Sequence, residues 1–174
     1  MTKSSSMKSN PATGLPAAMR ICKKVLLWIS IPLIAWYISA NYYQLMLIQG
    51  RSMEPNYKHL QLVVLNKHHR RFSYGDVVAF RSEELSSVLV KRIAACPGDT
   101  VEIRQGTLFV NGEVSAVYPE TGVFDYAGIL DQPLTLQPGA YFLLGDNIAE
   151  SKDSRYPEVG IVLEAFIYGY VISK

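Results

Sequence analysis

The fold of this chain is decided by residues 89–112, which read LVKRIAACPGDTVEIRQGTLFVNG. Three short runs of apolar and β-branched residues lie here, at 89–94, 100–103 and 107–110. Pro97-Gly98-Asp99 predicts a turn after the first run, and Asn111-Gly112 is a strong signal for a tight hairpin after the third. Runs of this kind between turn signals are typical of antiparallel β-structure.

The same pattern continues on both sides of this stretch. Further runs occupy residues 62–65, 76–80, 140–144, 161–162 and 166–172. Because these runs are short and regularly spaced, with no amphipathic helix between them, we expect a mainly β domain over residues 44–174. Its architecture would be an antiparallel β-sandwich or a partly open barrel. Residues from about 105 to 138 are expected to form a small irregular insertion.

The N-terminal part has a different character. Residues 25–43, VLLWISIPLIAWYISANYY, carry no charge. A helix of this length spans about 28 Å, close to the hydrocarbon thickness of a bilayer. We therefore expect one transmembrane helix over residues 21–43, after a disordered tail over residues 1–20. A buried core helix and a cleavable signal peptide ending near Ala40 are the alternatives.

The charge distribution predicts how this helix is oriented. No Asp or Glu precedes Glu54, whereas several basic residues stand before the apolar run: Lys3, Lys8, Arg20, Lys23 and Lys24. This bias predicts a single-pass protein of the cell membrane with a cytoplasmic N-terminus and an extracytoplasmic domain. The net charge of +2 is too small to indicate a nucleic-acid partner. The lipid bilayer is the expected partner of the N-terminal segment.

Two segments offer a nucleophile and a base. Ser52 stands between Gly50 and Pro55, in a turn that could direct its hydroxyl into a cleft and leave backbone N–H groups free for an oxyanion. Lys91 interrupts an apolar run, and strict alternation puts it on one face with Leu89 and Ile93. If that face is buried, the pKa of the lysine falls, as a general base requires. The other interpretation puts Lys91 on the solvent face.

The histidines offer no better base. His59, His68 and His69 lie in polar, basic surroundings, and the last two belong to Lys67-His68-His69-Arg70-Arg71. This basic segment is interpreted as a solvated turn, with contact to anionic lipid headgroups as the alternative. The sequence has neither a His/Cys metal cluster nor a glycine-rich phosphate loop, so no metal and no cofactor are expected.

Four motifs in order carry a family resemblance. They are Gly50-x-Ser52-Met53-x-Pro55, Gly75-Asp76-Val77-Val78, Lys91-Arg92 with Pro97-Gly98-Asp99, and Gly145-Asp146-Asn147 with Ser151-x-Asp153-Ser154-Arg155. Together they resemble type I signal peptidase, and the single short anchor is most like the Gram-positive bacterial members. The resemblance implies a serine endopeptidase that removes signal peptides from exported preproteins. The alternative is a non-catalytic, membrane-tethered β module that binds peptides or a protein partner.

The resemblance also implies roles for individual residues. Ser52 would be the nucleophile, Lys91 the general base, and the Ser52 N–H part of the oxyanion hole. Gly50 stands where some relatives carry a hydroxyl that completes this hole. The remaining implied roles are orientation of Lys91 by Ser151, ion pairs Arg92–Asp146 and Asp153–Arg155, and a substrate pocket lined by Met53 and Val90. The chain departs from the family pattern at Ile148, usually arginine, and at Asn56, commonly threonine.

Overall fold

The computed structural model describes residues 17–68, 71–120 and 123–172. The chain divides into two compact units, residues 1–38 and residues 39–174. Most of the predicted tail lies outside the described residues, but helix α1 (Ala17–Asn41) begins inside the range predicted for it.

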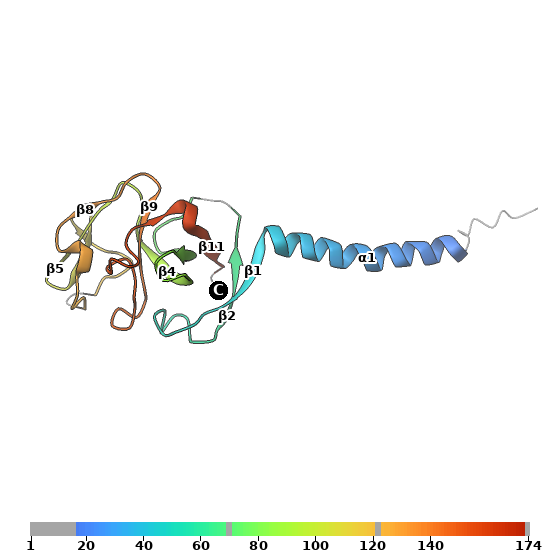
Figure 1. The fold of residues 1–174 in the computed structure, drawn as a ribbon, viewed down its shortest axis with the longest axis horizontal. Coiled ribbons are helices and arrows are strands. Elements are labelled where there is room, and N and C mark those ends of the chain that lie inside the picture. The colour runs from blue at the N-terminus through green and yellow to red at the C-terminus, as the bar shows by residue number, and fades with distance from the viewer. Residues whose placement is uncertain (1–16, 69–70, 121–122, 173–174) are drawn as a thin grey trace, which may run out of the picture. The chain divides into compact units, whose positions relative to one another are not determined.

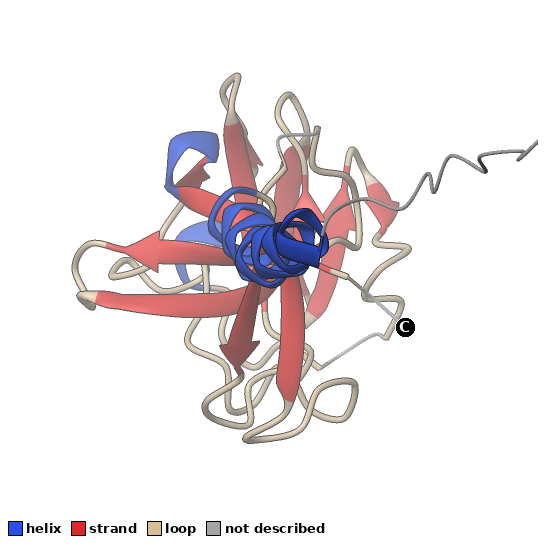
Figure 2. Ribbon diagram, turned by 90° about the vertical axis from the view of Figure 1, so that its right-hand side faces the viewer, coloured by secondary structure: helices blue, strands red, loops and turns tan. Residues whose placement is uncertain are grey.

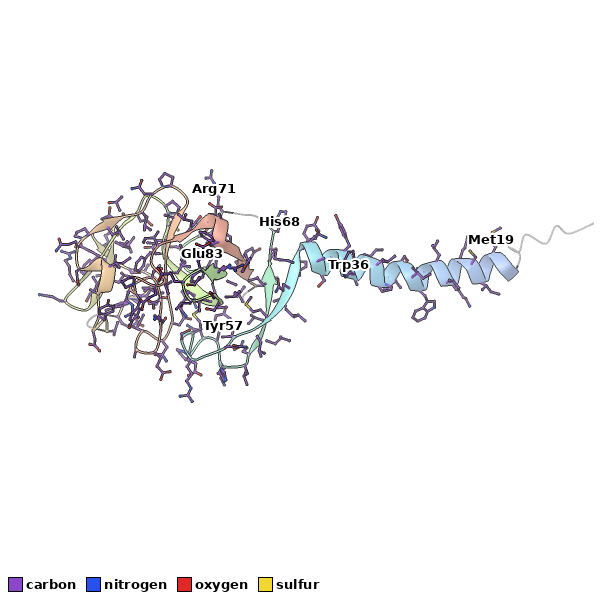
Figure 3. All side chains as sticks on the ribbon, in the orientation of Figure 1. Met19, Trp36, Tyr57, His68, Arg71 and Glu83 are labelled. Atoms are coloured by element: carbon purple, nitrogen blue, oxygen red, sulfur yellow. The ribbon has the colours of Figure 1, made fainter. Side chains whose placement is uncertain are left out.

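Helix α1 carries its charged residues, Arg20, Lys23 and Lys24, near its start and has none from Val25 onward. Residues 21–41 have a mean hydropathy of 1.6, and the helix is long and apolar enough to cross a membrane. Met19 and Trp36 project outward from the helix (Figure 3), and the side chain of Trp36 is largely exposed. None of the apolar window is buried, unlike the core helix that was one alternative.

The regular secondary structure of the second unit consists mainly of antiparallel strands. Figure 2 shows strands and loops with only short helical turns among them. Seven strands form the larger sheet in the order β1 (Tyr43–Leu47), β2 (Leu62–Asn66), β11 (Ile167–Val171), β3 (Val77–Ser82), β4 (Ser87–Ala95), β9 (Ala140–Leu144) and β10 (Val162–Leu163). This sheet does not close, because β1 and β10 are its edges within the described chain. The predicted mainly antiparallel, partly open β-architecture is confirmed.

A smaller sheet lies at one end of the second unit, where Figure 1 shows β5 and β8. Its order is β7 (Glu113–Val114), β6 (Thr107–Val110), β5 (Thr100–Arg104) and β8 (Leu134–Thr135). Asn111 and Gly112 both have positive φ, at 55° and 84°, as the predicted tight hairpin between β6 and β7 requires. Three of these strands fall within residues 105–138, so that range is more regular than the irregular insertion expected from the sequence.

Two short 3-10 helices complete the second unit. They are η1 (Gly128–Leu130), before β8, and η2 (Glu164–Phe166), between β10 and β11.

One of the apolar clusters supports the loop between β1 and β2. Ile48 and Met53 from this loop are 2% and 1% exposed, and they pack with Val63, Leu65 and Val171. Burying side chains of this size removes about 2 kcal/mol each of unfavourable hydration. The loop is therefore fixed to the larger sheet although it contains no regular secondary structure.

Candidate active site

The structure brings the side chains of Ser52 and Lys91 into contact. Lys91 Nζ donates a hydrogen bond of 2.7 Å to Ser52 Oγ, although the two residues are 39 positions apart. Lys91 comes from β4, and Ser52 comes from the loop between β1 and β2. When the amine is neutral, it can accept the hydroxyl proton, so this contact can activate a serine nucleophile.

Burial distinguishes between the two sequence interpretations of Lys91. The residue is 3% exposed and its neighbour Ile93 is fully buried, whereas Val88 is 48% exposed. Loss of water around the ammonium lowers the pKa of Lys91 from 10.5 to about 8, although Asp153 and Asp146 oppose the shift. At pH 7 roughly a tenth of such amines are uncharged, compared with well under a thousandth for an unperturbed lysine.

The turn that carries Ser52 is held from both sides. Gly50 has a φ of +90°, which favours glycine, and its N–H donates to His59 Nδ1 at 2.9 Å. On the other side, Asn147 N donates to Ser52 O at 3.0 Å. The N–H of Ser52 itself has no hydrogen-bond partner within the described residues, so this donor is available, whereas the Gly50 N–H is occupied.

The predicted hydrogen bond from Ser151 to Lys91 is wrong for this structure. Ser151 is 3% exposed, and its Oγ has no hydrogen-bond partner among the described residues. A Cβ added to Gly145 would clash with the Ser151 side chain and with the Ser52 carbonyl oxygen. Ser151 and Ser52 therefore both pack against Gly145, where the absence of a side chain permits the close approach.

Arg92 and Asp146 form the ion pair that the sequence suggested. Arg92 Nε and Nη2 contact the two Asp146 oxygens at 2.7 and 2.6 Å, and Nη1 donates to Gly75 O at 2.8 Å. Asn56 Nδ2 also donates to Asp146 Oδ2 at 2.9 Å. Asp146 thus joins the Ser52 loop to the residue that follows Lys91 on β4, and Asn56 takes part in a network that sequence reasoning did not assign to it.

Asp153 and Arg155 form a second pair, which is fully buried. Arg155 Nε contacts Asp153 Oδ1 at 2.8 Å, and Nη2 contacts Oδ2 at 3.1 Å. The same Nη2 donates to the carbonyl oxygens of Ile148 and Ser151 at 2.9 and 3.2 Å. Gly145 N donates to Asp153 Oδ2 at 3.2 Å. This pair fixes residues 145–155 in the conformation that packs against the Ser52 loop.

A groove of about 340 Å³ leads to the Ser52–Lys91 contact. It is lined by residues 46–49 and Ser52 on one side and by residues 87–91 on the other. Val90 lines the groove as expected, but Met53 lies beneath it, 1% exposed within the core. The placement of Met53 as a lining residue is therefore corrected, because an apolar residue type predicts burial without predicting the surface on which it lies.

The groove borders a free strand edge. β4 pairs with β3 through residues 87–92, but with β9 only from Arg92 onward. Residues 87–91 therefore have no second strand partner within the described chain. Their unpaired backbone groups can bind an extended peptide by strand addition.

The chain was compared with known proteins. Residues 21–173 match the family model described as Signal peptidase, peptidase S26. The match covers more than half of the chain, so this protein belongs to the signal peptidase family, peptidase S26.

Individual proteins similar to this chain are described as signal peptidase I. A signal peptidase I P of Bacillus subtilis subsp. natto is 33% identical over 120 residues, covering 62% of this chain and 63% of the relative. Signal peptidase I S of Bacillus subtilis strain 168 is 29% identical over 161 residues, covering 86% of this chain and 84% of the relative. A signal peptidase I crystal structure from Enterococcus faecalis V583 is 29% identical with a TM-score of 0.47, covering 60% of this chain and all of that one.

Proposed function

We propose that this protein is a membrane-anchored serine endopeptidase that removes signal peptides from exported preproteins. The observation that carries the proposal is the 2.7 Å contact between Ser52 Oγ and a buried Lys91 whose pKa is lowered to about 8. Family membership and the signal peptidase I names of the relatives support the substrate class.

The residues around Ser52 supply each step of an acyl-transfer reaction. Neutral Lys91 accepts the Ser52 proton as Oγ attacks the scissile carbonyl carbon, and the Ser52 N–H donates to the oxyanion that forms. The Lys91 ammonium then protonates the leaving amine, which departs with the mature protein. Water, deprotonated by the same amine, hydrolyses the acyl-enzyme and releases the signal peptide.

The supporting residues keep this geometry in place. The Arg92–Asp146 pair holds β4 against the Ser52 loop through Asn56, and the buried Asp153–Arg155 pair holds the segment that contacts Ser52 O. Ser151 is buried beside Gly145, in the segment whose Asn147 N–H donates to Ser52 O. Gly50 gives the turn its positive φ.

The substrate would bind as an extended strand along residues 87–91. Main-chain hydrogen bonds provide affinity, and a shallow groove beside Val90 selects small residues at the first and third positions before the cut. The reaction as proposed requires neither a metal nor another cofactor. Residues 21–43 would form the anchor with the N-terminus in the cytoplasm, and residues 44–174 the extracytoplasmic catalytic domain. Confinement to one membrane raises the effective concentration of substrate and enzyme.

The test uses the full chain in lipid vesicles and a fluorogenic peptide with alanine at those two positions. Ser52→Ala and Lys91→Ala should each reduce cleavage by about 10⁴-fold or more while the domain stays folded. Ser73→Ala and Lys152→Ala are matched controls, because both residues are exposed, and they should retain full activity. Cleavage by Ser52→Ala at the wild-type rate contradicts the proposal, and binding without cleavage by the wild type supports the non-catalytic module.

A further inference from the structure

An imidazole holds the turn that presents the nucleophile. His59 Nδ1 accepts a hydrogen bond of 2.9 Å from Gly50 N, two residues before Ser52. Only the neutral ring with its proton on Nε2 can accept at Nδ1, because both nitrogens of an imidazolium are donors. The contact therefore exists in one protonation state of His59 and is lost in the other.

The His59 contact is separate from the bonds that close the base of the loop. At the base, Ile48 N donates to Gln61 O at 2.9 Å, and Leu60 N donates to Ile48 O at 2.8 Å. Beyond this base, the bond to His59 is the sole hydrogen bond recorded for the Gly50 N–H in the described part of the chain. Without it, the peptide group between Gln49 and Gly50 loses its hydrogen bond to the rest of the loop, and the position of Ser52 relative to Lys91 becomes less well defined.

We propose that His59 is a positioning residue, which acts through Gly50 to hold Ser52 in line with Lys91, and that protonation of His59 releases the turn. This inference rests on the proposed function, because it assigns His59 a task only if Ser52 is the nucleophile. It gives the enzyme a second proton-dependent step besides the deprotonation of Lys91.

The ring of His59 lies at an exposed position of the loop and has no charged partner within the described residues. The charged residues of the loop are Arg51, Glu54 and Lys58, and His59 is exposed. No hydrogen bond or ion pair between these side chains and the imidazole occurs among the described residues. Imidazoles as a class change charge between pH 5 and pH 8. A protonated His59 ring cannot accept the hydrogen bond from Gly50 N.

The experiment compares three chains in vesicles over pH 5 to 9: wild type, His59→Asn and His59→Ala. Asparagine can place Oδ1 where Nδ1 lies, so His59→Asn keeps an acceptor that does not titrate. His59→Ala removes the acceptor at every pH. The readout is kcat/KM for the alanine-bearing fluorogenic peptide, with thermal unfolding of each variant as the folding control.

The chains should differ in the value of kcat/KM at high pH and in the slope of its pH dependence. At pH 9, His59→Ala should be about fivefold to tenfold slower than wild type, and His59→Asn should be within about twofold of it. On the acid side, log kcat/KM should fall with a slope of one for both variants. For the wild type the additional loss is at most the fivefold to tenfold effect of His59→Ala, so its slope should exceed one without reaching two. His68→Asn, which alters another exposed histidine, should keep the wild-type slope.

Two outcomes overturn the inference: His59→Ala indistinguishable from wild type across the range, or His59→Asn as impaired as His59→Ala. Ser52→Ala is measured in parallel. If Ser52→Ala cleaves the peptide, the proposed function fails, whatever the His59 variants do. If Ser52→Ala is inactive and the His59 variants behave like wild type, only the role of His59 fails.

Discussion

Lys91 and Arg155 are both basic and almost equally buried, at 3% and 2% exposed, yet their surroundings differ. The guanidinium of Arg155 contacts both oxygens of Asp153 and two backbone carbonyls. The amine of Lys91 contacts only the Ser52 hydroxyl within the described residues, and no carboxylate forms an ion pair with it. One buried cation is fully compensated, and the other is not.

This difference explains why one residue is structural and the other is suited to proton transfer. A buried charge is tolerated when it is paired and hydrogen-bonded, and arginine keeps its proton in any case. A buried lysine without a paired carboxylate is destabilised in its charged form, and its pKa falls toward neutrality. The contrast lies in the partners that the fold provides, since the exposed fractions are nearly the same.

The largest effect on stability should follow removal of the compensated cation. Arg155→Met leaves the Asp153 carboxylate buried without its partner, and the free energy of unfolding should fall by about 3–5 kcal/mol. Chemical denaturation of the detergent-solubilised chain measures this change. Lys152→Met, which alters an exposed lysine paired with Glu158 in the same segment, is the matched control and should change stability far less. Equal effects of the two variants would contradict the expectation that breaking the buried Arg155 pair costs more than breaking the exposed Lys152 pair.

Removal of Lys91, the uncompensated cation, should raise the free energy of unfolding rather than lower it. Lys91→Met should abolish cleavage. It should also raise the free energy of unfolding by on the order of 2–3 kcal/mol below pH 8, because the charged amine is less stable in the folded state than in the unfolded state. The folded pKa of about 8 lies below the unfolded value of 10.5, so the unfolded state binds more protons between these limits. Wild-type stability should therefore rise across that interval, and the advantage of the variant should shrink. A loss of stability in Lys91→Met at pH 7 contradicts this account.

The same pKa should appear in the kinetics. As pH rises from 7 to 9, the uncharged fraction of an amine with a pKa of about 8 grows roughly tenfold, and kcat/KM should grow with it. Asp146→Asn removes a charge that raises this pKa, so the midpoint should move to lower pH. A flat profile over this range in the wild type excludes Lys91 as the base.

The strands could be predicted from the sequence wherever a run of four or more mainly apolar or β-branched residues stands between turn signals. β2, β5, β6 and β9 lie close to their predicted positions. β1 was missed because its apolar residues continue the run of the helix, with neither glycine nor proline to mark the change. β7 and β8 are two residues long, too short for any periodic pattern to reveal.

In the candidate active site, the sequence predicted the reacting residues but not all of the contacts around them. Lys91 stood out because a charge interrupts an apolar run, and ordered motifs indicated Ser52. The contact between His59 and Gly50 joins two points of an irregular loop, so no spacing rule indicates it. The missing bond between Ser151 and Lys91 depends on side-chain rotamers, and the sequence carries no information on those.

Arg92 provides an intermediate case and the smallest expected effect. It follows Lys91 on β4 and is paired with Asp146 in the same bidentate way as Arg155, but its side chain is 20% exposed. Arg92→Lys keeps the charge and loses the fork geometry, because one ammonium nitrogen replaces the three nitrogens that contact Asp146 and Gly75 O. Stability should fall by about 1 kcal/mol and kcat/KM by less than tenfold, because Asn56 still holds Asp146 to the Ser52 loop. Arg104→Lys, at an arginine whose side chain is 54% exposed and paired with Glu102, is the matched control. A loss as large as that of Arg155→Met would mean that compensation by a carboxylate matters as much at partly exposed sites as at buried ones.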